Sequence, residues 1–415
     1  MMIRIFIAAL WVSVHLVMAQ SQTDEDEYTR YELLDPGTQS FRILYEVTAT
    51  KAGTMYYFNG LRKGSEHKVD SVKDLRTGKS LEWSIVSGAT AKKDGYLEAD
   101  ESGEYLKVQL ARAIANNSEY RILIDKTYKD TKSYFTENDK IVFERSLGIK
   151  RNAVVLPFGY EVIKCNYPVQ LSLENDGRIK VSFINSGPVA VPLRVEGRKL
   201  PSTVDLKVER KEYVYKSGEG RDKLKARINY EVPERAHQTR EIVYFLQQPE
   251  THSFRLYHDY TETRAGRNNY LNVVRAGSKA SDPSAKNLDT GESLKVETLV
   301  GNQIKEKGIK IEEEIKTDTE VIVIWYDPVQ QGHSTRLRIE ETYTDPNRYL
   351  INGNEFVWDR SFGRPHNTVV LPAGWFVTAN AIPATIDTTV DGKISLYYMN
   401  YAPDDIDVFV KGRKR

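Results

Sequence analysis

Histidine and carboxylate side chains gather in one short stretch of the chain, where His252, His258, Asp259 and Glu262 lie a few positions apart. An imidazole beside carboxylates can transfer protons near neutral pH, and the same groups can bind a metal ion such as zinc. His258, Asp259 and Glu262 are therefore the candidate catalytic residues of a hydrolase. The alternative interpretation is a histidine whose hydrogen bonds are satisfied inside the fold or at a contact between domains.

An alternating pattern from Phe254 to Glu262 predicts the strand that positions these groups. One face of this strand carries Phe254, Leu256, His258, Tyr260 and Glu262. The corresponding face earlier in the chain is a predicted core face, formed by Phe41, Ile43, Tyr45, Val47 and Ala49. Polar groups on a core face must be paired or must line a cavity. The contrast makes the stretch around His258 the first place to look for function.

Aromatic residues near the C-terminus offer a second candidate site. Tyr397, Tyr401 and Trp375 could form a stacking surface for a sugar or a peptide. Aromatic residues in strands also serve as core residues or as cross-strand pairs, which is the alternative here.

Two arginines recur in equivalent contexts, Arg145 after Glu144 and Arg360 after Asp359. A guanidinium group can clamp a carboxylate or a phosphate. We instead predict a structural role, in which Arg145 binds Asp130 and Arg360 binds Asp345, because both copies keep these residues. A catalytic pair of Glu144 and Asp359 would have to meet across two domains.

Motifs of the common enzyme classes are missing from the sequence. There is no His-Glu-x-x-His, Gly-x-Ser-x-Gly, phosphate-binding glycine loop or Cys-x-x-Cys motif, so we predict no cofactor and no metal. None of the 7 histidines has a histidine counterpart in the other copy, which excludes a duplicated metal site. The single cysteine, Cys165, rules out an intrachain disulfide and is predicted to be a structural thiol.

An internal repeat organises most of the sequence. The segment from Phe143 to Tyr160 and the segment from Val357 to Trp375 share the phrase Arg-Ser-x-Gly followed by Asn-x-Val-Val-Leu-Pro-x-Gly. Up to residue 81, further matching residues of the two copies are separated by one constant offset. From Arg121 onward the offset is again constant but two residues larger. We interpret this register as a tandem duplication and the phrase as a turn followed by a buried strand.

The pattern within each copy predicts β-structure. Short alternating runs are separated by turn signals such as Asn-Asp-Gly-Arg at 175–178 and Val-Asp-Gly-Lys at 390–393. We predict an all-β fold of two tandem β-sandwich units. The expected organisation is a signal peptide (1–19), a disordered N-terminus (20–27), unit 1 (28–200), a linker or hairpin (201–240) and unit 2 (241–415).

Composition and the N-terminus bear on location and partners. Arg4 precedes an apolar run that ends at Val-Met-Ala, which predicts a cleaved export signal and a periplasmic, cell-surface or secreted protein. We expect no transmembrane segment in the mature chain, because no other run is long enough. The formal net charge of +1 gives no electrostatic reason to expect nucleic acid as a partner.

Two stretches carry a resemblance to known families. The segments from Leu246 to Glu262 and from Asp359 to Trp375 resemble a family of exported bacterial proteins that lends no activity. More loosely, the strand from Arg121 to Ile124 and the Leu-Pro-x-Gly-Tyr/Trp strand resemble the N-terminal all-β domain of gluzincin aminopeptidases. The metal-binding helix of those peptidases has no counterpart here, so the resemblance implies a scaffold or substrate-flanking domain without the catalytic one.

The sequence therefore favours a non-catalytic binding or interaction protein of the cell envelope, with an unidentified protein or glycan as ligand. One alternative is a peptide or glycan hydrolase with its site in unit 2. The other is a structural protein of the envelope that associates with itself.

Overall fold

The computed structural model describes residues 22–23, 27–204, 212–213, 228–229, 234–402 and 405–415. The predicted signal peptide (1–19) lies outside this part of the chain, as do most of the predicted N-terminal tail (20–27) and much of the predicted linker (201–240). Within that linker, β15 (Glu212–Tyr213) and β16 (Ile228–Asn229) form a short antiparallel pair.

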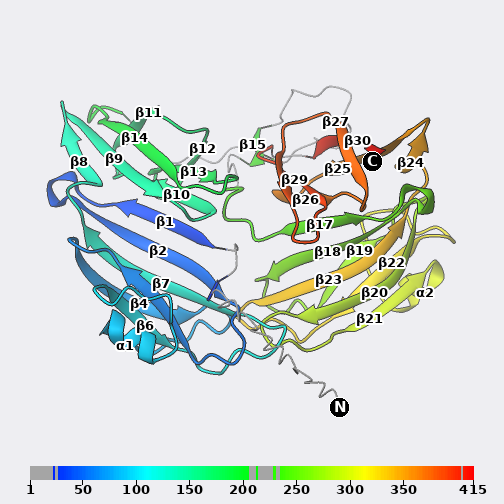
Figure 1. The fold of residues 1–415 in the computed structure, drawn as a ribbon, viewed down its shortest axis with the longest axis horizontal. Helices are drawn as coiled ribbons and strands as arrows, with labels where there is room; N and C mark the ends of the chain where they lie inside the picture. Colours follow the sequence, from blue (N-terminus) through cyan, green and yellow to red (C-terminus); the bar gives the residue numbers. More distant parts are fainter. Residues whose placement is uncertain (1–21, 24–26, 205–211, 214–227, 230–233, 403–404) are drawn as a thin grey trace, which may run out of the picture.

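The prediction of an all-β fold is confirmed. Strands make up nearly all regular structure, and the helices are short: η1 (Pro36–Thr38), α1 (Gly88–Lys93), η3 (Pro249–Thr251) and α2 (Asn302–Glu306). Two similar halves lie side by side (Figure 1). No helix among the described residues is long and apolar enough to span a membrane.

Three sheets form the first half. The largest runs in the order β12 (Gln170–Leu173), β13 (Ile179–Ile184), β10 (Arg151–Val155), β1 (Tyr28–Leu33), β2 (Ser40–Ala49), β7 (Tyr120–Lys129) and β4 (Glu66–Asp74). A four-stranded sheet contains β11 (Tyr160–Cys165), β14 (Val191–Lys199), β9 (Lys140–Leu147) and β8 (Tyr134–Glu137). A three-stranded sheet contains β3 (Tyr56–Leu61), β6 (Glu104–Gln109) and β5 (Trp83–Ser87).

The second half repeats these sheets strand for strand. Its largest sheet contains β28 (Thr385–Thr388), β29 (Ile394–Met399), β26 (His366–Val370), β17 (Glu241–Leu246), β18 (Ser253–Glu262), β23 (Thr335–Thr344) and β20 (Lys279–Asn287). The four-stranded sheet contains β27 (Trp375–Asn380), β30 (Ile406–Lys414), β25 (Glu355–Phe362) and β24 (Tyr349–Asn352). The three-stranded sheet contains β19 (Asn269–Val273), β22 (Glu320–Trp325) and β21 (Lys295–Val300).

The repeated Arg-Ser-x-Gly phrase connects two sheets. Its first part ends β9 in the four-stranded sheet, and its second part forms β10, an interior strand of the seven-stranded sheet. Every residue of β10 is buried because the strand is paired on both sides, in parallel with β1 and antiparallel with β13. The phrase is therefore strand, turn and buried strand rather than only a turn and a strand. Local patterns do not reveal the parallel pairing, since its partners are far apart in sequence.

Each half has its own apolar core, to which the inner face of the seven-stranded sheet contributes. The predicted core face of β2 is buried throughout: Phe41, Ile43, Tyr45, Val47 and Ala49. Aromatic rings make equivalent edge contacts in both halves, with centroids 5.6 Å apart for Phe41 and Phe143 and 6.1 Å apart for Phe254 and Trp358. The two cores together fix the strands on which any site must stand.

A buried ion pair joins the two halves where β7 and β23 begin. Arg121 makes a two-pronged contact with Asp289, with distances of 2.8 Å (Nε–Oδ1) and 2.9 Å (Nη2–Oδ2). A third contact to the Asp289 carboxylate comes from the backbone N–H of Arg336, which donates to Oδ2 at 2.9 Å. Arg336, the counterpart of Arg121, pairs in turn with Glu119 at 3.1 Å. The charges of these arginines are thus met by carboxylates that lie at the same joint.

Backbone contacts give this joint an approximate two-fold symmetry. Glu119 N–H donates to the carbonyl of Leu288 at 2.9 Å, and Ser334 N–H donates to the carbonyl of Arg76 at 3.1 Å. Glu119 and Ser334 are equivalent positions in the repeat, so the same surface of each half contacts the other half. Such a contact is isologous, as in a symmetric dimer, although here both partners belong to one chain.

A second contact lies between the seven-stranded sheets and the segment that precedes β17. Tyr28 O–H donates to Glu234 at 2.8 Å, and Arg235 donates from Nε to the carbonyl of Asn400 at 3.0 Å. Tyr401 also crosses between halves, since its hydroxyl accepts from the N–H of Ile184 at 2.8 Å. The halves are therefore held at two places.

We predict that Asp289→Ala lowers the free energy of unfolding by about 3 kcal/mol, because it leaves the Arg121 guanidinium buried without its carboxylate. Urea denaturation followed by tryptophan fluorescence measures the change. Asp70→Ala is the control, since its partner Lys68 is largely exposed and such pairs contribute at most about 1 kcal/mol. Equal losses for the two variants would contradict the importance of the joint.

Candidate functional site

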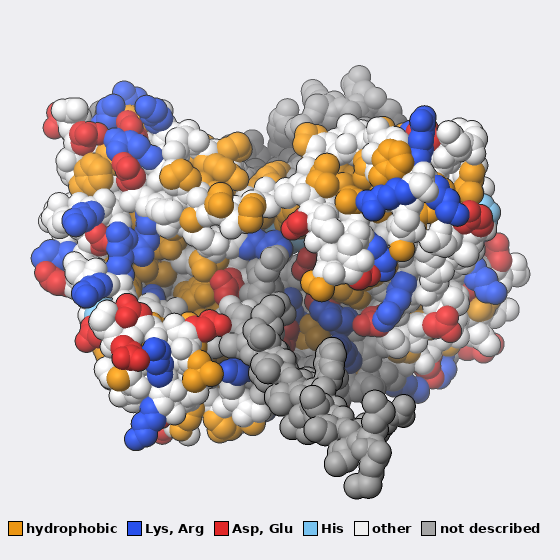
Figure 2. Space-filling model, in the orientation of Figure 1, with side chains coloured by type: hydrophobic (Ala, Val, Ile, Leu, Met, Phe, Trp, Pro, Cys, Tyr) orange, Lys and Arg blue, Asp and Glu red, His pale blue; other side chains and the backbone are white. Residues whose placement is uncertain are grey.

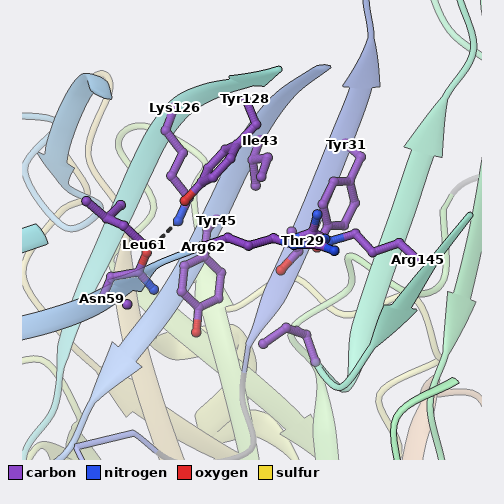
Figure 3. A pocket seen from close by; sticks show the side chains of 12 residues that line it. Thr29, Tyr31, Ile43, Tyr45, Asn59, Leu61, Arg62, Lys126, Tyr128 and Arg145 are labelled. Atoms are coloured by element: carbon purple, nitrogen blue, oxygen red, sulfur yellow. Dashed lines mark hydrogen bonds between the residues drawn. The ribbon is translucent and has the colours of Figure 1, made fainter. Parts of the chain in front are cut away.

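A cavity of about 280 Å³ opens in the first half, at the inner face of the seven-stranded sheet. Strands β1, β2, β3, β7 and β9 and the turn after β9 line it (Figure 3): Thr29, Tyr31, Ile43, Tyr45, Asn59, Gly60, Leu61, Arg62, Lys126, Tyr128, Arg145 and Ile149. Three cationic side chains belong to this lining. They make the cavity the strongest candidate for a functional site.

Lys126 is a charged residue on the core-facing side of β7. It follows Ile122 and Ile124 along β7 at two-residue spacing, so its side chain points inward with theirs. Only 6% of Lys126 is exposed. Its Nζ donates a hydrogen bond to Asn59 Oδ1, and no carboxylate among the described residues forms an ion pair with it.

Burial changes the acid–base behaviour of this amine. The loss of solvent, together with the positive charge of Arg145, lowers the pKa of Lys126 from 10.5 to about 7. Near neutral pH the group is therefore divided between ammonium and free amine. A lysine in this state can attract an anion when charged and act as a nucleophile when neutral.

Arg62 and Arg145 share a single carboxylate. Arg62 Nη1 lies 2.9 Å and Arg145 Nη1 lies 3.3 Å from Asp130 Oδ2, and both guanidinium groups donate to Ser133 Oγ. Burial disfavours ionisation of Asp130, but the hydrogen bond from Ser133 and the charge of Arg62 outweigh it and lower the pKa of Asp130. With Lys126, three basic groups thus face one acid.

Tyrosine rings form much of the remaining wall. Tyr31, Tyr45 and Tyr128 line the cavity, and burial raises the pKa of each phenol, so all three keep their protons at neutral pH. The guanidinium of Arg145 lies 5.8 Å from the ring centroid of Tyr31, within reach of a cation–π contact. The wall therefore combines apolar surface with neutral hydroxyl groups.

The second half carries the opposite charge at the position equivalent to Lys126. Glu341 on β23 occupies the place of Lys126 in the repeat, and it is 5% exposed. Asn272, the counterpart of Asn59, donates from Nδ2 to both carboxyl oxygens, at 2.7 and 3.0 Å. Burial raises the pKa of Glu341 to about 7. Each half therefore buries a titratable group against the equivalent asparagine, and the two groups, Lys126 and Glu341, carry opposite charges when ionised.

The three candidate catalytic residues do not converge. His258 and Asp259 are neighbours on β18, so their side chains point to opposite faces of the sheet. Asp259 makes a two-pronged ion pair with Arg338, at 2.7 Å for both contacts. His258 is buried beside Tyr270, whose hydroxyl lies 3.3 Å from Nδ1. Burial and the charges of Arg364 and Arg240 hold the pKa of His258 well below its usual value.

Glu262 is enclosed by its own strand end. Its carboxylate accepts from the hydroxyl of Tyr260 at 2.7 Å and from Nε and Nη2 of Arg264 at 2.9 and 2.6 Å. Burial opposes ionisation, but these donors lower the pKa of Glu262 to about 2. His252 lies apart, with Nδ1 2.9 Å from the carbonyl of Tyr349. No group of three metal-ligating side chains occurs among the described residues.

The aromatic candidates lie in separate, engaged positions. The Tyr397 hydroxyl is 2.8 Å from His366 Nδ1, and Tyr401 contacts the first half through Ile184. Trp375 is 5% exposed and donates from Nε1 to Gln248 at 3.0 Å. These side chains do not form one open stacking surface.

The repeated arginines make matching contacts in the two halves. Arg145 and Arg360 each lie 3.3 Å from their aspartate, Asp130 and Asp345 respectively. Arg145 also lines the cavity, so this residue joins a structural contact to a candidate site. Cys165 is partly buried against the first core.

Lys126, Asn59 and Glu341 are not among the site residues predicted from the sequence. The signal was present in two alternating runs, Ile-Leu-Ile-Asp-Lys-Thr-Tyr at 122–128 and Leu-Arg-Ile-Glu-Glu-Thr-Tyr at 337–343. In each run the inward positions are two aliphatic residues, a charged residue and a tyrosine. A charged residue at an inward position is the same anomaly that drew attention to His258.

Comparisons with known proteins give only distant likenesses. No family model and no curated protein matches the chain. An M1 zinc metallopeptidase from Deinococcus radiodurans matches with a TM-score of 0.28 and 10% identity, over 41% of this chain and 41% of that one.

Two other solved structures match at a similar level. An aminopeptidase N family protein from Idiomarina loihiensis has a TM-score of 0.26 and 11% identity, over 42% of this chain and 29% of its own. A protein from Legionella pneumophila, provisionally described as nutrient binding, has a TM-score of 0.26 and 8% identity, over 42% and 65%. Likenesses at this level show neither the ligand nor the activity of this chain.

The two buried groups predict opposite pH profiles of stability. Between about pH 7 and pH 10 the unfolded chain binds the proton that folded Lys126 has lost, so stability rises with pH, and the cost of the buried charge is greatest below pH 7. Between about pH 4.5 and pH 7 folded Glu341 holds a proton that the unfolded chain has lost, so stability falls as pH rises.

We therefore expect Lys126→Met to stabilise the protein by roughly 2 kcal/mol at about pH 5 and much less at about pH 9. Glu341→Gln should show the reverse, with its gain at about pH 9. Urea denaturation of both variants at the two pH values measures this crossover. Gains that do not depend on pH would contradict the assignment.

Proposed function

We propose that the protein is an exported, non-catalytic binding protein whose first half binds a carboxylate-bearing ligand in the Lys126 cavity. The observation that carries this proposal is a buried lysine without a carboxylate partner among the described residues, beside an open cavity. Buried charges in proteins are ordinarily paired or bind a ligand. A ligand carboxylate would supply the missing charge.

The charges around the cavity support an anion rather than a cation. Lys126, Arg62 and Arg145 face one acid, Asp130, which is already engaged by both arginines. A volume of about 280 Å³ suits a small molecule or the end of a larger one. Tyrosine and aliphatic walls would pack against the apolar part of that ligand.

The second half supports the proposal as an internal comparison. It has the same strand order and the same asparagine, yet Glu341 replaces the lysine. We propose that the halves, 28–200 and 241–415, arose by duplication and that the first alone kept or acquired anion binding. The export signal predicted from the N-terminal sequence supports binding outside the cytoplasm, in the periplasm, at the surface or in the medium.

The alternatives have weaker support. A hydrolase centred on His258 would need Asp259 and Glu262 near the imidazole, and both carboxylates are committed to arginines. A self-associating envelope protein would need an interface, and on the face seen in Figure 2 acidic and basic side chains are interspersed over both halves.

We predict that acetate, lactate and benzoate bind near neutral pH and that binding takes up protons, because an anion beside Lys126 raises the pKa of its amine. Isothermal titration calorimetry in buffers of different ionisation enthalpy measures both the affinity and the number of protons taken up. Lys126→Met and Arg62→Ala should each weaken binding by about tenfold or more, a loss of about 1.4 kcal/mol.

Matched variants of the second half serve as controls. Glu341→Gln and Arg275→Ala change the positions equivalent to Lys126 and Arg62, and they should leave the affinity unchanged. Binding that survives Lys126→Met, or that falls equally in the controls, would overturn the proposal. Absence of binding for all three carboxylates in the wild-type protein would do the same.

A further inference from the structure

Lys126 differs from an ordinary anion-binding lysine because it is enclosed and its amine is partly uncharged near neutral pH. This difference points to covalent capture of the ligand. We propose that the cavity takes 2-oxo acids, with Lys126 Nζ bonding to the carbonyl carbon as an imine and with Arg62 and Arg145 holding the carboxylate. This inference rests on the proposed function, because the same cavity must first bind the anion. It adds a chemical requirement, a carbonyl group, that simple anion binding lacks.

The surroundings of Nζ leave the nitrogen free to react. Its one hydrogen bond is donated to Asn59 Oδ1, and no carboxylate among the described residues holds the group as an ammonium ion. The lone pair of the neutral amine is therefore available to the cavity. The lowered pKa of about 7 means that a large fraction of the amine is neutral at physiological pH.

The arginines provide a separate place for the carboxylate. Arg62 and Arg145 extend toward each other from opposite sides of the cavity, and both reach Asp130 (Figure 3). Their two positive charges against one carboxylate leave an attraction for a second anion. Arg62 is 42% exposed and stands at the open side, whereas Lys126 is enclosed. A ligand needs an anionic end for the arginines and an electrophilic carbon for the lysine.

The reaction balances without a further reagent. Nζ attacks the carbonyl carbon to give a carbinolamine, and the hydroxyl group then leaves as water as the carbon–nitrogen double bond forms. Tyr128, whose phenol is protonated because burial raises its pKa, can give the departing hydroxyl a proton and regain one from nitrogen. Apolar wall residues such as Ile43 and Leu61 limit the access of water that would reverse the step.

Reductive trapping tests this inference in the full-length protein. Wild-type protein is incubated with pyruvate and cyanoborohydride, which reduces an imine to a stable amine, and the modified lysine is located by peptide mass spectrometry. We expect modification at Lys126 in large excess over exposed Lys68, with a rate that rises through about pH 7 as the amine loses its proton. Lactate, which lacks the carbonyl, should compete without forming an adduct.

The outcomes separate this inference from the proposed function. If lactate and pyruvate bind with equal affinity by calorimetry and no adduct forms, imine formation is overturned and the proposed anion site still stands. Adducts spread evenly over exposed lysines would also overturn it. Binding of neither acid would overturn both proposals. The mapping uses wild-type protein, so the test does not depend on the Lys126→Met variant. Arg62→Gln should reduce trapping while leaving the nucleophile in place, because Arg62 is not among the groups that shift the pKa of Lys126.

Discussion

The fold depends on meeting every buried charge with an opposite charge or an adequate hydrogen bond, because an uncompensated ion inside a protein costs several kcal/mol. Arg121 and Asp289 meet this condition where the halves join, and Arg338 and Asp259 meet it inside the second half. Lys126 is the informative exception. It is as deeply buried as Arg121 and Asp259, yet its compensation is a single amide oxygen.

The joint explains why two similar halves make one molecule. Equivalent surfaces meet through an approximate two-fold axis, so Glu119 and Ser334 make related backbone contacts with the opposite half. The ions of the joint are not symmetric, however, since Asp289 stands where the first half has Arg76. This difference places a carboxylate in contact with the side chain of Arg121 and with the backbone N–H of Arg336.

The sequence was sufficient for the fold class and insufficient for the site. Alternating runs and Asp-Gly turns predict strands because both signals are local. The parallel pairing of β1 with β10 and the pairing of Arg121 with Asp289, 168 positions away, depend on long-range assembly that no local pattern encodes. Glu262 is a different case, because its strand position drew attention while its partners, Tyr260 and Arg264, lie only two residues away in sequence. Whether a polar residue on a core face is satisfied depends on its neighbours.

The asparagine common to both halves shows how one scaffold can carry opposite charges. A carboxamide accepts a hydrogen bond through oxygen and donates through nitrogen, so a rotation about its last bond changes its polarity without a change of backbone. Asn59 presents oxygen to Lys126, and Asn272 presents nitrogen to Glu341. A carboxylate or a lysine in place of asparagine would serve only one charge. The amide therefore permits charge reversal on the neighbouring strand while both halves keep the same sheets.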